Sequence, residues 1–168
     1  MDPFPDDIFN LADIVLRVAR EDPERVAVID LDGWESYGTR RYKRHTYAEL
    51  SADVESVAVG LRDMGIAELT RTVCMSPPSY ETCVMGVALT RVGAFSIWID
   101  PSVGYRNVAE RLSRVQPEAF LGNALAHLGR ITFGWGPRDL RKLVVTESPL
   151  LPGGRIITGF PPFPGAHS

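Results

Sequence analysis

Cysteine and histidine are scarce in this sequence, which argues against a metal centre or a disulfide framework. The 168 residues include two cysteines and three histidines. Cys74 and Cys83 stand nine positions apart, outside zinc-ligand spacing, and His45, His127 and His167 are far apart in the chain. We therefore predict no metal site. We expect both thiols to be free and to fill apolar space, with a disulfide or a reactive thiol as the alternative.

Long apolar runs and an excess of basic charge are also missing. No run approaches the roughly 20 apolar residues that a membrane span needs. Residues 1–7 are acidic and interrupted by proline, unlike a signal sequence. The formal charge of −3 gives no electrostatic footprint for nucleic acid. We expect a cytoplasmic protein without a membrane span or a nucleic-acid partner, and we interpret Arg40–His45 as a solvated edge strand rather than an RNA-binding strand.

No phosphate-binding motif is complete. Residues 154–159 and 129–134 have the glycine spacing of a P-loop, but neither is followed by the Lys-Ser/Thr pair that such a loop requires. No G-x-G-x-x-G follows a predicted strand, which argues against a dinucleotide-dependent oxidoreductase. The chain has two lysines, Lys43 and Lys142, and neither follows a glycine-rich turn. The sequence therefore predicts no ATP-binding residue and no cofactor bound by this chain alone.

What the sequence does contain is a regular alternation of strands and helices from Thr72 onward. Strands that are separated by helices cannot be hairpins, so the pattern predicts an α/β fold with a parallel sheet and right-handed crossover helices. We expect Val73, Ile97 and Phe120 to lie on neighbouring strands. The predicted strands are Thr72–Met75, Ala94–Asp100, Ala119–Gly122 and Leu143–Thr146, and the predicted helices are Glu81–Val92, 105–116 and Ala124–Phe133.

The predicted helix Glu81–Val92 is apolar almost all the way round. Such a helix is buried on both sides or lacks a partner that would bury it. An apolar patch of this kind beside an unpaired sheet edge favours association. We therefore expect the isolated chain to self-associate or to bind a missing C-terminal part.

The first part of the chain predicts two helices flanking a strand pair. Asn10 is expected to cap a helix that ends before Asp22-Pro23, with an apolar stripe at Leu11, Ile14, Val15 and Val18. Arg25–Leu31 and Arg40–His45 are predicted strands that pair at the surface, with a turn at Asp32-Gly33. Thr46–Glu49 fits a capping box, which opens a one-faced helix that ends at Gly65. Its apolar stripe is Leu50, Val54, Val57, Leu61 and Met64.

Few residues qualify as catalytic candidates. Ser76 and Ser79 follow a strand, but G-x-S-x-G is missing, so we interpret Ser79 as a helix N-cap. Asp100 stands at the carboxyl end of a strand, where open α/β sheets bind ligands, although Asp100-Pro101 is also an ordinary turn. We interpret His127 as a helix-surface residue. The sequence therefore yields no catalytic, cofactor-binding or metal-binding assignment.

Two sequence motifs, which follow each other along the chain in the same order as in a known family, resemble that family. Thr46-Tyr47-Ala48-Glu49-Leu50 resembles the TYxEL element near the start of the adenylate-forming, AMP-binding acyl-CoA synthetase and ligase superfamily. The segment from Leu89 to Pro101 is similar to its second core element, which ends a strand in Asp-Pro. The segments 99–104 and 116–122 look most like the fatty-acid ligase branch, which includes the olefin β-lactone synthetases. The resemblance covers about residues 8 to 146.

The resemblance implies an incomplete N-terminal subdomain of the adenylate-forming fold. Members of the superfamily are much longer and use ATP and magnesium through a phosphate loop and a C-terminal domain, neither of which matches here. We therefore expect residues 1–146 to form a partial AMP-binding-type domain and residues 147–168 to form a disordered Pro/Gly-rich tail. The leading hypothesis is a truncated or split acyl (fatty acid) adenylating ligase that is inactive alone. A non-catalytic binding or interaction module is the alternative, and a small independent α/β enzyme is a third.

Overall fold

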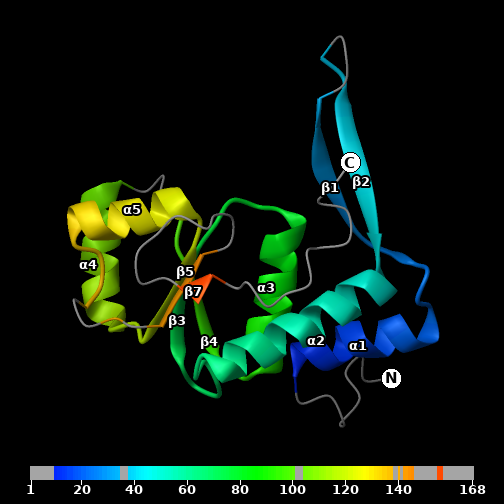
Figure 1. Cartoon of the computed structure of the whole chain (residues 1–168), viewed down its shortest axis with the longest axis horizontal. Helices are drawn as coiled ribbons and strands as arrows, with labels where there is room; N and C mark the ends of the chain where they lie inside the picture. Colours follow the sequence, from blue (N-terminus) through cyan, green and yellow to red (C-terminus); the bar gives the residue numbers. More distant parts are fainter. Residues whose placement is uncertain are drawn as a thin grey trace, which may run out of the picture.

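The chain forms an α/β structure with two separate sheets, shown in Figure 1. The computed structural model describes residues 10–34, 38–100, 104–137, 140, 142–145 and 155–156. The helices are α1 (Leu11–Glu21), α2 (Tyr47–Asp63), α3 (Tyr80–Arg91), α4 (Tyr105–Val115) and α5 (Ala124–Phe133). The strands are β1 (Val26–Trp34), β2 (Arg40–Thr46), β3 (Arg71–Met75), β4 (Phe95–Trp98), β5 (Ala119–Gly122), β6 (Lys142–Val145) and β7 (Arg155–Ile156).

The larger sheet is parallel and has the strand order β4-β3-β5-β6-β7. Val73 stands opposite Ile97 on one side and Phe120 on the other. The predicted parallel neighbours and the α/β fold class are therefore confirmed. Each of the strands β3, β4 and β5 leads through one helix into the strand that follows it in the chain, as parallel pairing requires.

Apolar side chains build a separate core on each face of this sheet. On one face, α2 and α3 pack against Cys74, Leu121 and Val144 of the strands. On the other face, Val108 of α4 and Ala126 of α5 pack against the strand side chains that point to that face of the sheet. Figure 1 shows α1, α2 and α3 grouped together and α4 and α5 at the other end of the molecule. The alternation of side chains along each strand thus supplies both cores.

Helix α3 is buried on two sides, between the sheet and the other N-terminal helices. Its buried residues are Tyr80, Val84, Met85, Ala88 and Leu89. Arg91 at its end bonds Glu55 of α2 at 2.8 Å and lies 3.5 Å from Asp13 of α1. Of the two alternatives for this helix, burial on both sides is therefore confirmed. The helix is not an exposed patch, and self-association stays a prediction that must rest on other surfaces.

The helix starts follow the predicted capping chemistry. Asn10 accepts a hydrogen bond from the Ala12 amide, and Thr46 and Glu49 form a complete capping box at the start of α2. Gly65 has a φ of 73°, the left-handed geometry that ends a helix. The predicted stripe of α1 was wrong at one position. Leu11 is 65% exposed and Ala12 takes the buried place, because the first turn of the helix presents Ala12, and not Leu11, to the rest of the protein.

The strands β1 and β2 form a two-stranded antiparallel ribbon that projects from the rest of the molecule (Figure 1). The predicted turn at Asp32-Gly33 was wrong, because β1 continues to Trp34. Asp32 is the extra residue of a register shift between Leu31 and Gly33, and Gly33 has the positive φ of 110° that such a bulge accommodates. The connection between the two strands includes residues 35–37, which lie outside the described residues.

The tail predicted over residues 147–168 falls almost wholly outside the described residues. Within it, Arg155–Ile156 pairs in parallel with β6. The boundary at residue 146 and the disorder of the tail stay predictions. Among the described residues, no helix is long and apolar enough to cross a membrane.

Candidate functional site

The carboxyl ends of β3 and β5 mark the point where the sheet changes winding direction. From β3 the chain passes through α3 to β4 on one side, whereas from β5 it passes through α5 to β6 on the other. The two helices cover opposite faces of the sheet. Open α/β sheets bind ligands in the crevice at such a point. This edge is therefore the candidate site that the fold itself provides.

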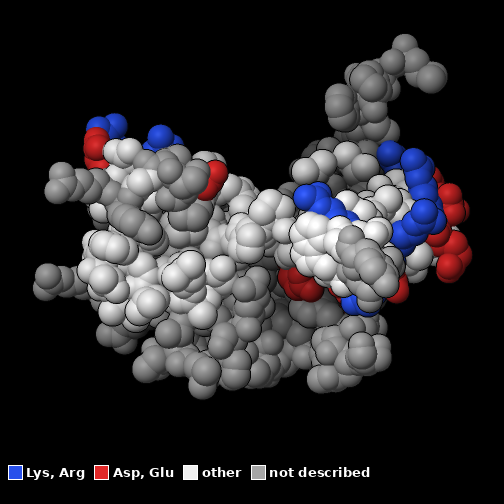
Figure 2. All heavy atoms as spheres, turned by 90° about the horizontal axis from the view of Figure 1, so that it is seen from above, with Lys and Arg blue, Asp and Glu red and all other residues white. Residues whose placement is uncertain are grey.

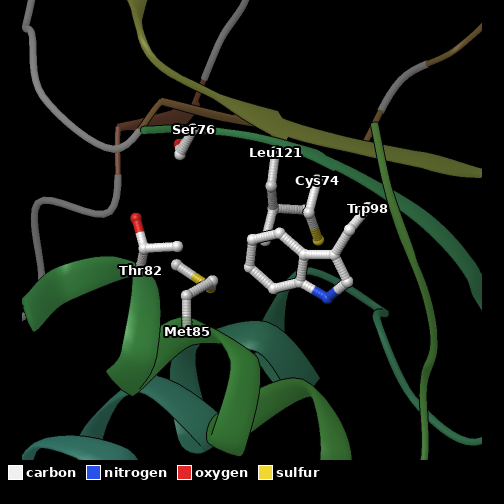
Figure 3. Close-up of a pocket in the computed structure, with 6 residues that line it drawn as sticks. All are labelled: Cys74, Ser76, Thr82, Met85, Trp98 and Leu121. Atoms are coloured by element: carbon white, nitrogen blue, oxygen red, sulfur yellow. The ribbon is translucent and has the colours of Figure 1, made fainter. Parts of the chain in front are cut away.

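A small pocket lies close to this edge, on the face covered by α3. Six side chains from β3, α3, β4, β5 and the turn after β3 line it, and Figure 3 shows them around a common space. The volume within which the centre of a water molecule can move is about 10 Å³, so the cavity has room for about one water. The lining residues are Cys74, Ser76, Thr82, Met85, Trp98 and Leu121.

The pocket wall is mostly apolar, and its hydroxyl groups are used inside the protein. The Thr82 hydroxyl donates to the Pro77 carbonyl at 2.7 Å. The Trp98 ring lies against α3 at Gly86, where an added Cβ would stand 3.4 Å from the ring. Because Gly86 has no side chain, the indole of Trp98 can approach the helix. The space suits a small apolar group or a single water, and it is too small for a nucleotide.

The start of α3 points toward this edge, but its free backbone groups already have partners. The Ser79 side chain accepts from the Thr82 amide, which confirms its prediction as an N-cap. The Tyr80 amide donates to a carboxylate oxygen of Asp30 at 3.1 Å. A helix N-terminus attracts anions through such amides, and here a carboxylate of β1 takes that place.

The two cysteines have different surroundings. Cys74 is buried in β3, and burial raises the pKa of its thiol to about 12. Cys83 is exposed on α3 and is not among the buried residues of that helix, so the expectation that it fills apolar space was wrong. Partial burial, and then the charges of Asp30 and Glu81, raise the pKa of the Cys83 thiol. Both thiols are free, and neither is activated as a nucleophile.

His127 is the clearest correction to the sequence analysis. It was predicted on a helix surface, but it is only 2% exposed, and its Nε2 lies 2.8 Å from the Val144 carbonyl oxygen. Because a carbonyl can only accept, Nε2–H donates. Helix α5 turns Leu125 and Leu128 outward and places the histidine over β5 and β6, in edge contact with Phe120. Burial lowers the pKa of His127 and keeps the ring neutral.

A second polar cluster joins the ribbon to the helices. The rings of His45 and Tyr80 stack with centroids 3.6 Å apart, and the Tyr80 hydroxyl donates to Asp53 at 2.7 Å. Burial is the main cause that raises the pKa of the Asp53 carboxyl. The sequence analysis placed His45 at the end of a solvated edge strand, which was wrong for this residue, because it is only 7% exposed, with its ring against Tyr80. Its position at the end of a strand beside the capping box was the available signal that it packs inward.

The remaining candidates do not assemble into a reactive centre. Asp100 is exposed just beyond β4, and a ligand role for it stays a prediction. Gly129 lies inside α5 and Gly134 ends it with a φ of 64°, so that glycine pair belongs to a helix rather than to a phosphate loop. No group of three potential metal ligands occurs among the described residues. His167 and most of residues 154–159 lie outside the described part of the chain.

Comparisons with known proteins agree with this fold. The model of the family described as "AMP-binding enzyme" matches residues 15–150. The chain belongs to the AMP-binding enzyme family. An olefin beta-lactone synthetase of Xanthomonas campestris is 36% identical over 151 residues, which cover 89% of this chain and 26% of that protein. One from Stenotrophomonas maltophilia is 34% identical over 81% of this chain and 25% of its own length.

Solved structures of adenylate-forming proteins share the fold. A putative long-chain-fatty-acid CoA ligase from Rhodopseudomonas palustris aligns with a TM-score of 0.72 at 20% identity, over 87% of this chain and 35% of its own. The N-terminal subdomain of Klebsiella oxytoca NpsA aligns with a TM-score of 0.65 at 18% identity, over 82% and 31%. The chain thus spans about a quarter of the length of the curated relatives, and it matches their N-terminal part.

Proposed function

We propose that this chain supplies the N-terminal part of an ATP-dependent acyl-adenylating ligase, with a fatty acid as the carboxylate substrate. In that reaction the carboxylate attacks the α-phosphate of ATP, giving an acyl-adenylate and releasing pyrophosphate. The observation that carries the proposal is the match to AMP-binding enzymes over residues 15–150, together with 36% identity to an olefin beta-lactone synthetase. We place this activity in the cytoplasm, where ATP is available.

We further propose that the chain does not adenylate by itself. The reaction needs the α-phosphate held in line while cations and backbone N–H groups neutralise developing charge. The described residues at the switch point do not fit ATP with magnesium: the pocket admits about one water, and the α3 N-terminus is occupied by Asp30. Lys142 begins β6 at the opposite, amino edge of the sheet, where its Nζ donates to the Gly65 carbonyl at 2.6 Å.

A non-catalytic interaction module is the second candidate. Exposed apolar side chains favour it, since α5 presents Leu125, Leu128 and Ile131 at 74%, 54% and 59% exposure. Seen from above, the surface around α5 carries few charges, whereas charged side chains gather around the ribbon (Figure 2). Apolar surface of this kind is typical of proteins that bind a partner.

The two candidates are separated by pyrophosphate exchange with fatty acids, ATP and magnesium. The first sample is the purified chain, for which we expect no carboxylate-dependent exchange. The second is a fusion in which residues 15–146 replace the matched segment of the Xanthomonas campestris relative, for which we expect exchange. The unmodified relative is the positive control, and the relative without its matched segment is the negative control.

Two results would contradict the proposal in different ways. Exchange by the chain alone that disappears in Asp100→Asn or Ser79→Ala would reveal an active site within this chain. A fusion that is folded, as judged by a cooperative thermal transition, but inactive would favour the interaction module.

A further inference from the structure

Helix α5 is held on the sheet by few buried side chains. Its buried residues are Ala126 and His127, whereas α2 and α3 bury five residues each. Ala126 belongs to the second apolar core, to which α4 contributes Val108 and Leu112. Trp135 follows the helix and completes the attachment. The hold of α5 on the sheet therefore depends on one alanine, one tryptophan and one histidine.

The histidine is the member of this set that can change its charge near neutral pH. The ring of His127 is buried, its Nε2–H donates to the Val144 carbonyl of β6 at 2.8 Å, and it makes an edge contact with Phe120 of β5. An imidazolium in this place keeps the hydrogen bond but brings a full charge into an apolar contact between a helix and a sheet. Such a charge is costly unless it is paired with an opposite one.

The charged groups near His127 are cations. Arg130 lies three residues further along α5, and its Nε atom is buried without a hydrogen-bond partner among the described residues. Strand β5 has no charged residue, and Lys142 at the start of β6 donates its Nζ to the Gly65 carbonyl at 2.6 Å. Burial is the main cause that lowers the pKa of His127, the Val144 carbonyl opposes this effect, and the charge of Arg130 adds to it.

We propose that α5 is an acid-sensitive element of this fold: protonation of His127 beside Arg130 releases the helix from β5 and β6, while α2 and α3 stay packed on the sheet. In the released state water solvates the imidazolium, and the two cations separate. Because α5 begins directly after its cap at Asn123, next to β5 at the switch point, the release also changes the edge of the sheet that forms the candidate site. The inference does not depend on the proposed function.

The release is local because the two apolar cores lie on opposite faces of the sheet. The first core holds α2 and α3 and contains no residue of α5. In Figure 1, α5 lies at the end of the molecule away from α1, α2 and α3. An element that buries few apolar side chains opens at a lower free energy than the core of the same protein.

The direction of the pH effect follows from where the proton binds more tightly. In the released state the pKa of His127 is the ordinary 6.5, whereas in the closed state burial lowers it. The released state therefore binds the proton more readily, and the closed state is favoured above pH 6.5. As the pH falls from 6.5 toward the closed-state pKa, the ratio of released to closed molecules rises by up to about tenfold for each pH unit.

The test is hydrogen exchange of the intact chain at pH 7 and pH 5, followed by mass spectrometry. Rates are divided by the intrinsic exchange rate at each pH, which gives the protection of α5 and of α2. We expect α5 to be less protected than α2 by roughly tenfold or more at both pH values, and to lose protection by roughly threefold or more between pH 7 and pH 5. Urea below the unfolding transition should lower the protection of α2 but hardly that of α5, because a local opening exposes little surface.

Three variants assign the effect to its residues. In His127→Gln the amide can still donate to the Val144 carbonyl but cannot be protonated, so α5 should have the same protection at both pH values. His45→Gln is the matched control, because it replaces a second buried histidine and should leave the acid dependence of α5 in place. Arg130→Met removes one of the causes that lower the pKa of His127, so the loss of protection between pH 7 and pH 5 should become smaller.

Several outcomes would overturn the proposal. Equal protection of α5 and α2 at each pH would mean that the whole structure opens at once. Protection of α5 that does not change between pH 7 and pH 5, or an acid dependence that survives in His127→Gln and disappears in His45→Gln, would contradict the role of His127. If His127→Gln shows no cooperative thermal transition, Arg130→Met decides: a smaller acid dependence supports the proposal, and an unchanged one contradicts it.

Discussion

The contact between His127 and β6 leads to a prediction about stability and its pH dependence. His127→Leu removes the donor that meets the Val144 carbonyl oxygen at 2.8 Å and the edge contact with Phe120. A buried carbonyl that loses its partner costs about 1–3 kcal/mol, and the aromatic contact adds about 0.5–1.5 kcal/mol. Leucine regains part of this through apolar burial, so we expect a net loss of about 1–3 kcal/mol at pH 8. Each 1 kcal/mol lowers Tm by about 2–4 °C in a protein of this size.

The pH dependence provides the sharper part of this prediction. Burial lowers the pKa of His127 in the folded protein below its ordinary value of 6.5, so the unfolded chain binds the proton more readily. The contribution of the neutral, bonded ring is therefore complete above pH 6.5 and is lost as the pH falls from 6.5 toward the folded pKa. The difference in unfolding free energy between wild type and His127→Leu should shrink over that range.

Urea unfolding at a series of pH values between 5 and 8 measures this difference. Leu128→Gln is the control, because Leu128 is next to His127 in the chain and its side chain is 54% exposed. We expect this substitution to change the unfolding free energy by no more than about 0.5 kcal/mol at every pH. Equal stability of wild type and His127→Leu at pH 8, or a difference that grows as the pH falls, would refute the reasoning.

Three further predictions concern other parts of the structure. Gly122→Ala would place a Cβ 2.9 Å from the Met75 carbonyl oxygen, so we expect a loss of about 1–3 kcal/mol by urea unfolding, and a neutral result would mean that the strand ends can separate. Asp53→Asn removes a carboxyl whose pKa is raised mainly by burial. That group stabilises the fold below pH 3.8 and its contribution is lost as the pH rises through the folded pKa, so the variant should lose this dependence, and an unchanged profile would count against it. Maleimide at pH 8 should modify Cys83 in the folded chain and reach Cys74 only on unfolding, and two fast thiols by mass spectrometry would contradict the burial of Cys74.

The sheet could be predicted because its determinants are local in the sequence. Apolar strands separated by helix-length segments leave parallel pairing as the solution, and Ser79, Asn10 and the box at Thr46 mark the helix starts by chemistry that acts within three residues. The family resemblance rested on two local segments, the box at Thr46 and the segment from Leu89 to Pro101, and the comparisons confirm it.

The errors concern orientation, which depends on neighbours distant in the chain. Nothing near His127 in the sequence shows that α5 turns its leucines outward. Residue type alone favours burial of the leucines, and it is tertiary packing that buries the histidine instead. The bulge at Asp32 depends on β2 as well as β1, and Gly33 reads equally as a turn residue or as a bulge residue. The junction of His45, Tyr80 and Asp53 joins three elements and has no local signature.

The same distinction bears on the candidate site. A switch point is created by strand order, and this chain creates one between β3 and β5 with its own residues. If the proposed adenylation takes place at this edge, the groups that neutralise phosphate are not these pocket residues, because Trp98, Met85 and Leu121 line the space with apolar atoms. If these side chains form only a supporting wall, Trp98→Leu should lower the stability of the isolated chain and of the active fusion alike, while the fusion's KM for ATP stays unchanged. If the indole contacts a substrate, the KM for the fatty acid or for ATP must change as well. The comparison therefore decides whether this edge of the sheet is scaffold or part of the reacting site.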